Sequence, residues 1–148
     1  MIYTKMTVAA MKLAYEAHHG QVDKGGVPYI FHPFHLAEQM EDEISCAAAL
    51  LHDVVEDTSV TLAELEAQFP PEVTEAVRLL THEKGVAQMN YLAALAVNPV
   101  ARRVKLADIA HNDNAQRAAA GAPLSAETRI RLHKKYQTAR EFLLTFEP

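Results

Sequence analysis

Four side chains that can carry charge follow a run of apolar residues in the segment Ala48–Thr58, AALLHDVVEDT. They are His52, Asp53, Glu56 and Asp57. On a helix, where each residue advances about 100°, these four fall within a sector of about 140° and can point into one cleft. A solvated polar face is the ordinary explanation for such a sector. The apolar residues that share the sector argue against it here, and a divalent cation would relieve the repulsion between neighbouring carboxylates.

Two other segments offer side chains that could complete a metal site. His32 stands where a loop enters an expected helix, and Asp108 lies in the middle of an alanine-rich helical segment. Together with His52 and Asp53 they form a mixed nitrogen and oxygen ligand set, which suits Mn, Fe or Zn better than Ca or Mg. Such a set differs from the closed, cysteine-rich site of a structural zinc. Asn112 is expected one turn after Asp108 on the same helix face.

Several helices are needed to bring these side chains together, and the hydrophobic pattern is helical almost throughout. We expect helices over about residues 5–18, from near His32, over 44–56, from Thr61 to near Phe69, around 73–80, over 89–96, from Asn98 to Gly121, and from Ser125 onward. Side chains at Thr61, Asn98 and Ser125 are expected to cap the helices that they begin. No segment alternates as a strand over a useful length. The sequence therefore predicts a single all-α bundle over residues 1–148, with one metal site in a central cleft.

The composition narrows the class of protein and of partner. Of the 148 residues, 49% are apolar and 22% are charged, as in an ordinary soluble domain. The single cysteine, Cys46, lies in an apolar run, which predicts a buried thiol and fits a reducing cytoplasm. The N-terminal residues lack the pattern of a signal peptide, and no stretch is long and apolar enough to span a membrane. A net charge of −5 without a basic cluster argues against binding to nucleic acid.

Three segments, GQVDKGGVPYIFHP, AALLHDVVEDT and VKLADIAHN, occur in the order and approximate spacing of the hydrolase domain of the RelA/SpoT homologues. From about residue 17 to residue 112 the chain resembles this family of the HD superfamily. Its members remove the 3′-pyrophosphate from the alarmones ppGpp and pppGpp, and their usual ion is Mn²⁺. The metal ligands that the resemblance implies are His32, His52, Asp53 and Asp108.

The resemblance also implies roles for other positions. Glu56 and Asp57 match the acidic pair that positions and deprotonates the attacking water, a role that suits carboxylates beside a metal. Asn112 matches a polar residue that helps to hold the nucleotide, and Lys24 matches a basic loop residue near the substrate. Hydrolysis would release pyrophosphate and leave a nucleoside 5′-di- or triphosphate.

The chain departs from the family at positions that concern the base. Asp23 stands where the family usually has an Arg that packs against guanine. An Asp offers neither a stacking surface nor a cation, although it can accept hydrogen bonds from a base or a ribose. The family's LADR is LADI here, with Ile109, and its HNMRT is HNDNA. The sequence therefore does not define the base of the substrate. An adenine alarmone such as ppApp or another 3′-phosphorylated nucleotide is an alternative to ppGpp.

Two other functions stay open. One is an HD-domain phosphohydrolase with a different substrate, such as a 5′-nucleotidase, and the other is a non-catalytic nucleotide sensor. The VEDT element and the glycine-rich loop before YIFHP favour the pyrophosphohydrolase over the first, and the presence of both Glu56 and Asp57 argues against the second. The length leaves no room for the synthetase and regulatory domains of the long family members. We therefore expect a stand-alone small alarmone hydrolase, an architecture also seen in the metazoan SpoT homologue, with an oligomeric state that the sequence does not define.

Some of the remaining ring side chains have expected places. His111 is expected to support Asp108, because metal ligands are usually held by neighbours. His82 and His133 have no companions in the sequence and are expected on the surface. Tyr29 is expected in the core or at the edge of the pocket.

Overall fold

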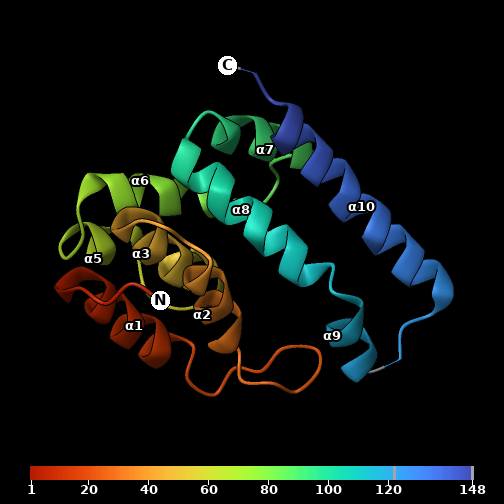
Figure 1. Ribbon diagram of the computed structural model, residues 1–148, viewed down its shortest axis with the longest axis horizontal. Coiled ribbons are helices and arrows are strands. Elements are labelled where there is room, and N and C mark those ends of the chain that lie inside the picture. Colours follow the sequence, from red (N-terminus) through yellow and green to blue (C-terminus); the bar gives the residue numbers. More distant parts are fainter. Residues whose placement is uncertain (122, 148) are drawn as a thin grey trace.

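The computed structural model describes residues 1–121 and 123–147, and helices make up its regular structure (Figure 1). The helices are α1 (Lys5–Ala17), α2 (Phe31–Glu38), α3 (Glu43–Leu51), α4 (Val54–Asp57), α5 (Leu62–Glu66), α6 (Pro71–Leu80), α7 (Gln88–Ala96), α8 (Pro99–Asn112), α9 (Ala115–Ala120) and α10 (Ala126–Thr145). Within the described residues, β pairing is limited to an isolated bridge between Val22 and Pro28 in the loop before α2. The predicted all-α class is confirmed.

Helix α3 lies at the centre of the bundle, and its residues from Ser45 to Leu51 are all buried. It packs against α1 and α2 on one side and against α6 and α8 on the other, while α10 runs along α7 and α8 at the outer edge (Figure 1). Three consecutive alanines, at positions 47–49, keep α3 narrow enough for close neighbours. Because α3 is enclosed, the residues that follow its C-terminus are carried into the interior of the bundle.

The helix expected over residues 44–56 is interrupted at His52 and Asp53, which corrects the prediction. His52 Nδ1 lies 2.7 Å from the carbonyl oxygen of Ala49, and the backbone N–H of His52 also donates to this oxygen. In a continuous helix this carbonyl would accept the N–H of Asp53 instead. The two site residues therefore lie in a turn between α3 and α4 and not on one helix face.

The helix expected from Asn98 to Gly121 also divides. The Asn114 side chain accepts hydrogen bonds from two backbone N–H groups of the next turn and begins α9 as its N-cap. The residue before it, Asp113, bonds to His133 and Gln137 of α10. Capping and tertiary bonds thus end α8 at Asn112.

Other local predictions are confirmed. The side chains of Thr61, Asn98 and Ser125 each accept a hydrogen bond from the backbone N–H three residues later, as N-caps do. The thiol of Cys46 is buried. Among the described residues, no helix combines the length and apolar character that crossing a membrane requires.

Candidate metal centre

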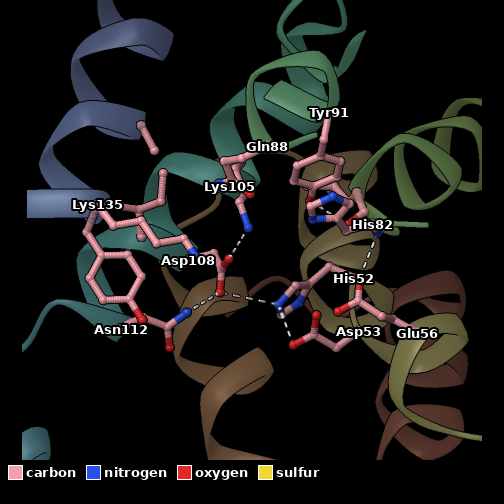
Figure 2. A pocket seen from close by; sticks show the side chains of 14 residues that line it. His52, Asp53, Glu56, His82, Gln88, Tyr91, Lys105, Asp108, Asn112 and Lys135 are labelled. Atoms are coloured by element: carbon pink, nitrogen blue, oxygen red, sulfur yellow. Dashed lines mark hydrogen bonds and ion pairs between the residues drawn. The ribbon is translucent and has the colours of Figure 1, made fainter. Parts of the chain in front are cut away.

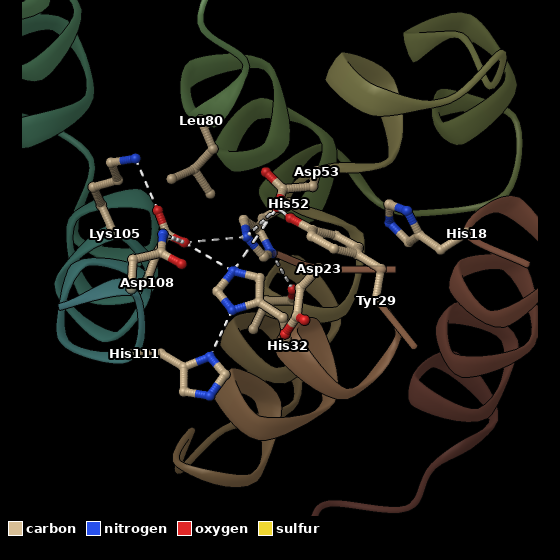
Figure 3. A network of polar contacts seen from close by, with 12 residues as sticks. His18, Asp23, Tyr29, His32, His52, Asp53, Leu80, Lys105, Asp108 and His111 are labelled. Atoms are coloured by element: carbon tan, nitrogen blue, oxygen red, sulfur yellow. Dashed lines mark hydrogen bonds and ion pairs between the residues drawn. The ribbon is translucent and has the colours of Figure 1, made fainter. Parts of the chain in front are cut away.

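The structure brings His32, His52, Asp53 and Asp108 together from three parts of the chain (Figure 3). His32 lies in the first turn of α2, His52 and Asp53 in the turn after α3, and Asp108 in α8. His32 Nε2 is 2.9 Å from Asp108 Oδ1 and 3.9 Å from Asp53 Oδ2. His52 Nε2 is 2.9 Å from Asp53 Oδ2 and 3.7 Å from Asp108 Oδ1. Two ring nitrogens and two carboxylate oxygens therefore face one small volume.

The donor set of this cluster fits a divalent cation. His52 Nε2 is buried, and although Asp53 Oδ2 lies 2.9 Å away, no contact among the described residues has the geometry of a hydrogen bond to this nitrogen. A buried nitrogen without a well-directed hydrogen bond costs free energy, and a bound cation would satisfy it. Two imidazoles and two carboxylates are typical ligands of divalent transition metals. These four side chains are the ones that would hold such an ion.

The charges within the cluster also suit a cation. Burial opposes the charged form of each group, but the opposite charges of its neighbours outweigh burial. Facing Asp53 and Asp108, the His52 imidazole has a pKa well above its ordinary value. The contact with His52 lowers the pKa of Asp53 to about 2, and bonds from both histidines help to hold the pKa of Asp108 well below its usual range. Both carboxylates therefore stay ionised and favour a positive charge between them.

Two of the four side chains are oriented by rings from elsewhere in the chain. The hydroxyl of Tyr29 donates a hydrogen bond to Asp53 Oδ2, and His32 Nδ1 lies 2.7 Å from His111 Nδ1 (Figure 3). The contact of His111 with His32 corrects the expectation that it would support Asp108. Burial and neighbouring cationic groups lower the pKa of His111 to about 4. Near neutral pH His111 is therefore uncharged and can accept the Nδ1–H of His32.

Asp108 is held by two residues of its own helix. Lys105 Nζ donates to Asp108 Oδ2 at 2.8 Å, and Asn112 Nδ2 donates to Asp108 Oδ1 at 3.0 Å. The Lys105 ammonium also lies 5.4 Å from the centre of the Tyr91 ring, within reach of a cation–π interaction. Burial opposes the charge on Lys105, but the Asp108 carboxylate raises the Lys105 pKa above its ordinary value. Lys105 therefore stays charged and restrains the outer oxygen of Asp108.

Glu56 and Asp57 lie in α4, on the solvent side of the cluster. Oxygens of Asp53, Glu56 and Asp57 come within 4.8 Å of one another. Glu56 Oε1 accepts the backbone N–H of His82 at 2.7 Å, which fixes its direction (Figure 2). Burial, followed by the charges of Asp53 and Glu56, raises the pKa of Asp57 to about 6. The two carboxylates are exposed and can meet water that approaches the cluster.

A cavity of about 150 Å³ adjoins the cluster, and its wall includes His52, Asp53, Glu56, Asp108 and Asn112 (Figure 2). Three of the four cluster residues, the acid Glu56 and the predicted nucleotide contact Asn112 therefore line one space. The cavity is therefore the candidate place of reaction.

Part of this wall is not predictable from the sequence. His82, which was expected on the surface, lines the cavity, and its ring stacks on Tyr91 with centroids 4.2 Å apart. Lys135 and Tyr136 reach the cavity from α10. These contacts arise from the packing of helices that are distant in sequence, so no local sequence pattern predicts them. Lys105 did leave a signal, because it precedes Asp108 by three residues on the same helix face.

The loop residues predicted to contact substrate lie outside this wall. Asp23 Oδ1 accepts the backbone N–H groups of Gly25 and Val27, and Asp23 Oδ2 accepts a bond from Arg117 of α9 at 3.2 Å. Lys24 is exposed. Burial opposes the ionised form of Asp23, but the two N–H groups and Arg117 lower its pKa. Asp23 therefore shapes the loop and joins it to α9.

Comparison with known proteins gives consistent matches. Residues 10–142 match the family model described as HD domain. The bifunctional (p)ppGpp synthase/hydrolase SpoT of Escherichia coli (strain K12) is 32% identical over 154 residues, which cover 94% of this chain and 20% of that protein. A guanosine-3′,5′-bis(diphosphate) 3′-pyrophosphohydrolase of Vibrio cholerae is 42% identical over 82 residues, covering 50% of this chain and 12% of that protein. The chain thus spans a fifth or less of the length of these curated relatives.

A solved structure of a metazoan orthologue of SpoT, reported to hydrolyse ppGpp, shares the fold. It aligns with a TM-score of 0.79 and 24% identity, over 98% of this chain and 88% of that one. The family model covers α2, the turn after α3 and α8, the three elements that supply the His and Asp cluster. On this sequence match and this shared fold, the chain belongs to the HD domain family.

Proposed function

We propose that this protein is a metal-dependent hydrolase that removes the 3′-pyrophosphate of guanosine or adenosine alarmones, (p)ppGpp or (p)ppApp. The observation that carries the proposal is the cluster of two imidazoles and two carboxylates beside Glu56 and Asp57. The names of the relatives support the substrate class. The proposal includes Mn²⁺ as the cofactor, residues 1–148 as one hydrolase domain, and a small-molecule nucleotide in the cytoplasm as the partner.

The cluster residues would hold the cation. His32 and His52 would contribute nitrogens, and Asp53 and Asp108 would contribute oxygens. A bound divalent cation supplies positive charge to phosphoryl oxygens and lowers the pKa of water. The chain's own contribution is to fix these ligands through neighbouring hydrogen bonds, which commonly matter 10–100-fold for metal affinity.

The acidic pair would act on the water. In the proposed step, Glu56 or Asp57 accepts a proton from a water molecule whose oxygen attacks the phosphorus attached to the ribose 3′ oxygen. The bond between that phosphorus and the 3′ oxygen breaks, and the ribose oxygen takes up a proton to become a hydroxyl. Pyrophosphate leaves with the oxygen of the water. The N–H of His82 would keep Glu56 directed toward this place.

Three polar residues are proposed to contact the nucleotide. Asn112 lines the cavity next to Asp108 and can bond to the nucleoside. Lys24 is exposed and offers a cation to an approaching phosphate. Asp23 is proposed to influence the choice of base, either directly or through Arg117, which it binds. These roles rest on the resemblance in sequence and on the position of each side chain.

A substrate panel tests the proposal. The purified protein with Mn²⁺ is given ppGpp, pppGpp, ppApp, pppApp and, for comparison, GMP, AMP and GDP. The expected result is release of pyrophosphate from one or more of the four alarmones, with no phosphate release from the 5′-nucleotides. Hydrolysis of the 5′-nucleotides alone would replace the proposal with a 5′-nucleotidase, and tight binding without turnover would replace it with a sensor.

A further inference from the structure

A second cavity, of about 370 Å³, continues from the candidate site along the groove between α7 and α10. The two cavities share three wall residues, Gln88, Lys135 and Ala139. Figure 2 shows Lys135 reaching from α10 toward the space beside Asp108. The first cavity is smaller than the roughly 300–1,000 Å³ that usually encloses a drug-sized ligand. A whole nucleotide therefore has to extend beyond it, and this groove is a continuous extension.

The groove has an apolar floor and a cationic side. Met89 and Leu92 of α7 and Ala139 of α10 contribute apolar surface, and the exposed fraction of Met89 is 46%. Arg131 and Lys134 follow one side of the groove at helical spacing, and Lys135 joins them at the shared wall.

The three cations of the groove are not neutralised by carboxylates of the described residues. Within residues 1–121 and 123–147, Arg131, Lys134 and Lys135 form no ion pair, whereas Arg78 and Arg103 each pair with a carboxylate. Helix α7 on the opposite side of the groove, with the sequence QMNYLAALA, contains no acid that could neutralise them. The groove therefore presents local positive charge on a chain whose net charge is −5. An anion is the complementary occupant.

We propose that this groove is a subsite for the 5′-phosphates of the nucleotide, with Arg131 and Lys134 as its phosphate-binding cations. This inference rests on the proposed function. In a nucleoside with phosphates on both the 3′ and 5′ oxygens, the two arms leave the same ribose, so an arm fixed beside His52 and Asp53 leaves the other arm within the adjoining space. The shared residue Lys135 lies where the two arms diverge. The apolar floor would contact the C–H groups of the ribose. The cations would bind the negatively charged 5′-phosphates.

The test compares guanosine substrates that carry the same 3′-diphosphate and differ only at the 5′ position: hydroxyl, mono-, di- and triphosphate. In the wild-type protein KM should fall as 5′ phosphates are added, by about five- to tenfold from the hydroxyl to the diphosphate, because a few exposed ion pairs contribute that much. The double variant Arg131→Gln, Lys134→Gln should lose most of this dependence, with kcat within about twofold. The dependence should also weaken at high ionic strength in the wild type.

A matched control removes the same charge from the same helix. Arg129→Gln, Arg140→Gln changes two exposed cations of α10 that line neither cavity, and it should keep the wild-type dependence. The same KM series in the Arg131, Lys134 variant and in the wild type would overturn the inference, as would an equal loss in the control. If the protein hydrolyses none of these substrates, the proposed function fails, but dissociation constants for the same four nucleotides, measured by calorimetry, still decide whether the groove reads 5′ charge.

Discussion

Hydrogen bonds from neighbouring residues fix the orientation of the side chains that would bind the metal. Tyr29 holds Asp53 from the loop before α2, and Lys105 holds Asp108 from the preceding turn of α8. The contact between Lys105 and Asp108 can be predicted from the sequence, because three-residue spacing places the two side chains on one helix face. The contact between Tyr29 and Asp53 cannot be predicted in this way, since these residues are 24 positions apart and meet only through tertiary packing. Ligand types were therefore predictable, whereas most of their partners were not.

Replacing Glu56 separates proton transfer from binding. In Glu56→Gln the amide oxygen can still accept the N–H of His82, so the position of the side chain is kept while its basicity is lost. We expect kcat to fall roughly 10²-fold or more, the scale of general acid–base catalysis, with metal content retained. Steady-state kinetics and elemental analysis measure the two effects. Glu83→Gln, at an exposed acid nearby, is the control, and near-normal turnover in Glu56→Gln would remove Glu56 from the mechanism.

The contact between His111 and His32 makes a prediction about metal affinity. His111→Leu removes the acceptor for the Nδ1–H of His32 and should weaken metal binding by about 10- to 100-fold. His111→Asn supplies an amide oxygen in its place and should recover much of the affinity. Competition with a chromogenic chelator measures the dissociation constants. The ring of His35 also packs against His111, but within the described part of the chain its side chain makes no hydrogen bond, ion pair or ring contact with the four cluster residues. His35→Leu should therefore bind as the wild type does, and equal affinity in His35→Leu and His111→Leu would contradict the role of His111.

Hydrophobic spacing and caps predicted where the helices form, whereas local bonds between side chains and backbone decided where two of them break. His52 diverts the Ala49 carbonyl and ends α3, and Asn114 caps a new helix after α8. Both breaks depend on a side chain turning back to the backbone, a choice that periodicity does not record. Each break lies beside the site. The helix ends therefore direct side chains of the site into positions that a continuous helix would not give them.

The junction between α9 and the loop before α2 makes an element-scale prediction. A Cβ added at Gly121 would meet the carbonyl oxygen of Lys24 at 2.7 Å, too close for backbone to accommodate without movement. Gly121→Ala should destabilise this junction by about 1–3 kcal/mol. Hydrogen exchange should show faster exchange in residues 21–28 with little change in α3. Gly25→Ala, whose Cβ would meet a side-chain oxygen of Asp23 at 3.3 Å, should have a smaller effect, and unchanged exchange in Gly121→Ala would show that the junction is loose.

At the scale of the whole molecule, one buried helix organises the core and the site. The alanine-rich α3 packs against α1, α2, α6 and α8, and the turn after it carries His52 and Asp53 between α2 and α8. Composition and periodicity were enough to predict an all-α bundle of this kind. They did not reveal that α10 would close one side of the cavity, because α10 is mostly polar and its contacts depend on the paths of the preceding loops.

Metal binding should stabilise the whole fold, since the cluster joins three separate segments. At a free Mn²⁺ concentration of 100 times its dissociation constant, mass action adds about 2.7 kcal/mol to the free energy of unfolding. For a chain of this size that raises Tm by roughly 5–10 °C. Calorimetric scans with Mn²⁺ and with a chelator measure the shift. His133→Gln, at an exposed histidine, should show the full shift, while His52→Gln should show little, and an equal shift in both would place the ion elsewhere.

If the cluster and its acidic pair direct water to the phosphorus on the ribose 3′ oxygen, the oxygen of that water must leave in the pyrophosphate. Single-turnover hydrolysis of ppGpp, or of the preferred alarmone, in ¹⁸O-labelled water with Mn²⁺ tests it most directly, with the products analysed by mass spectrometry. We expect one ¹⁸O atom in the released pyrophosphate and none in the nucleoside 5′-diphosphate, and no reaction in an Asp53→Asn variant. Label in the ribose hydroxyl, or in inorganic phosphate released from a nucleotide that keeps its 3′-monophosphate, would contradict it.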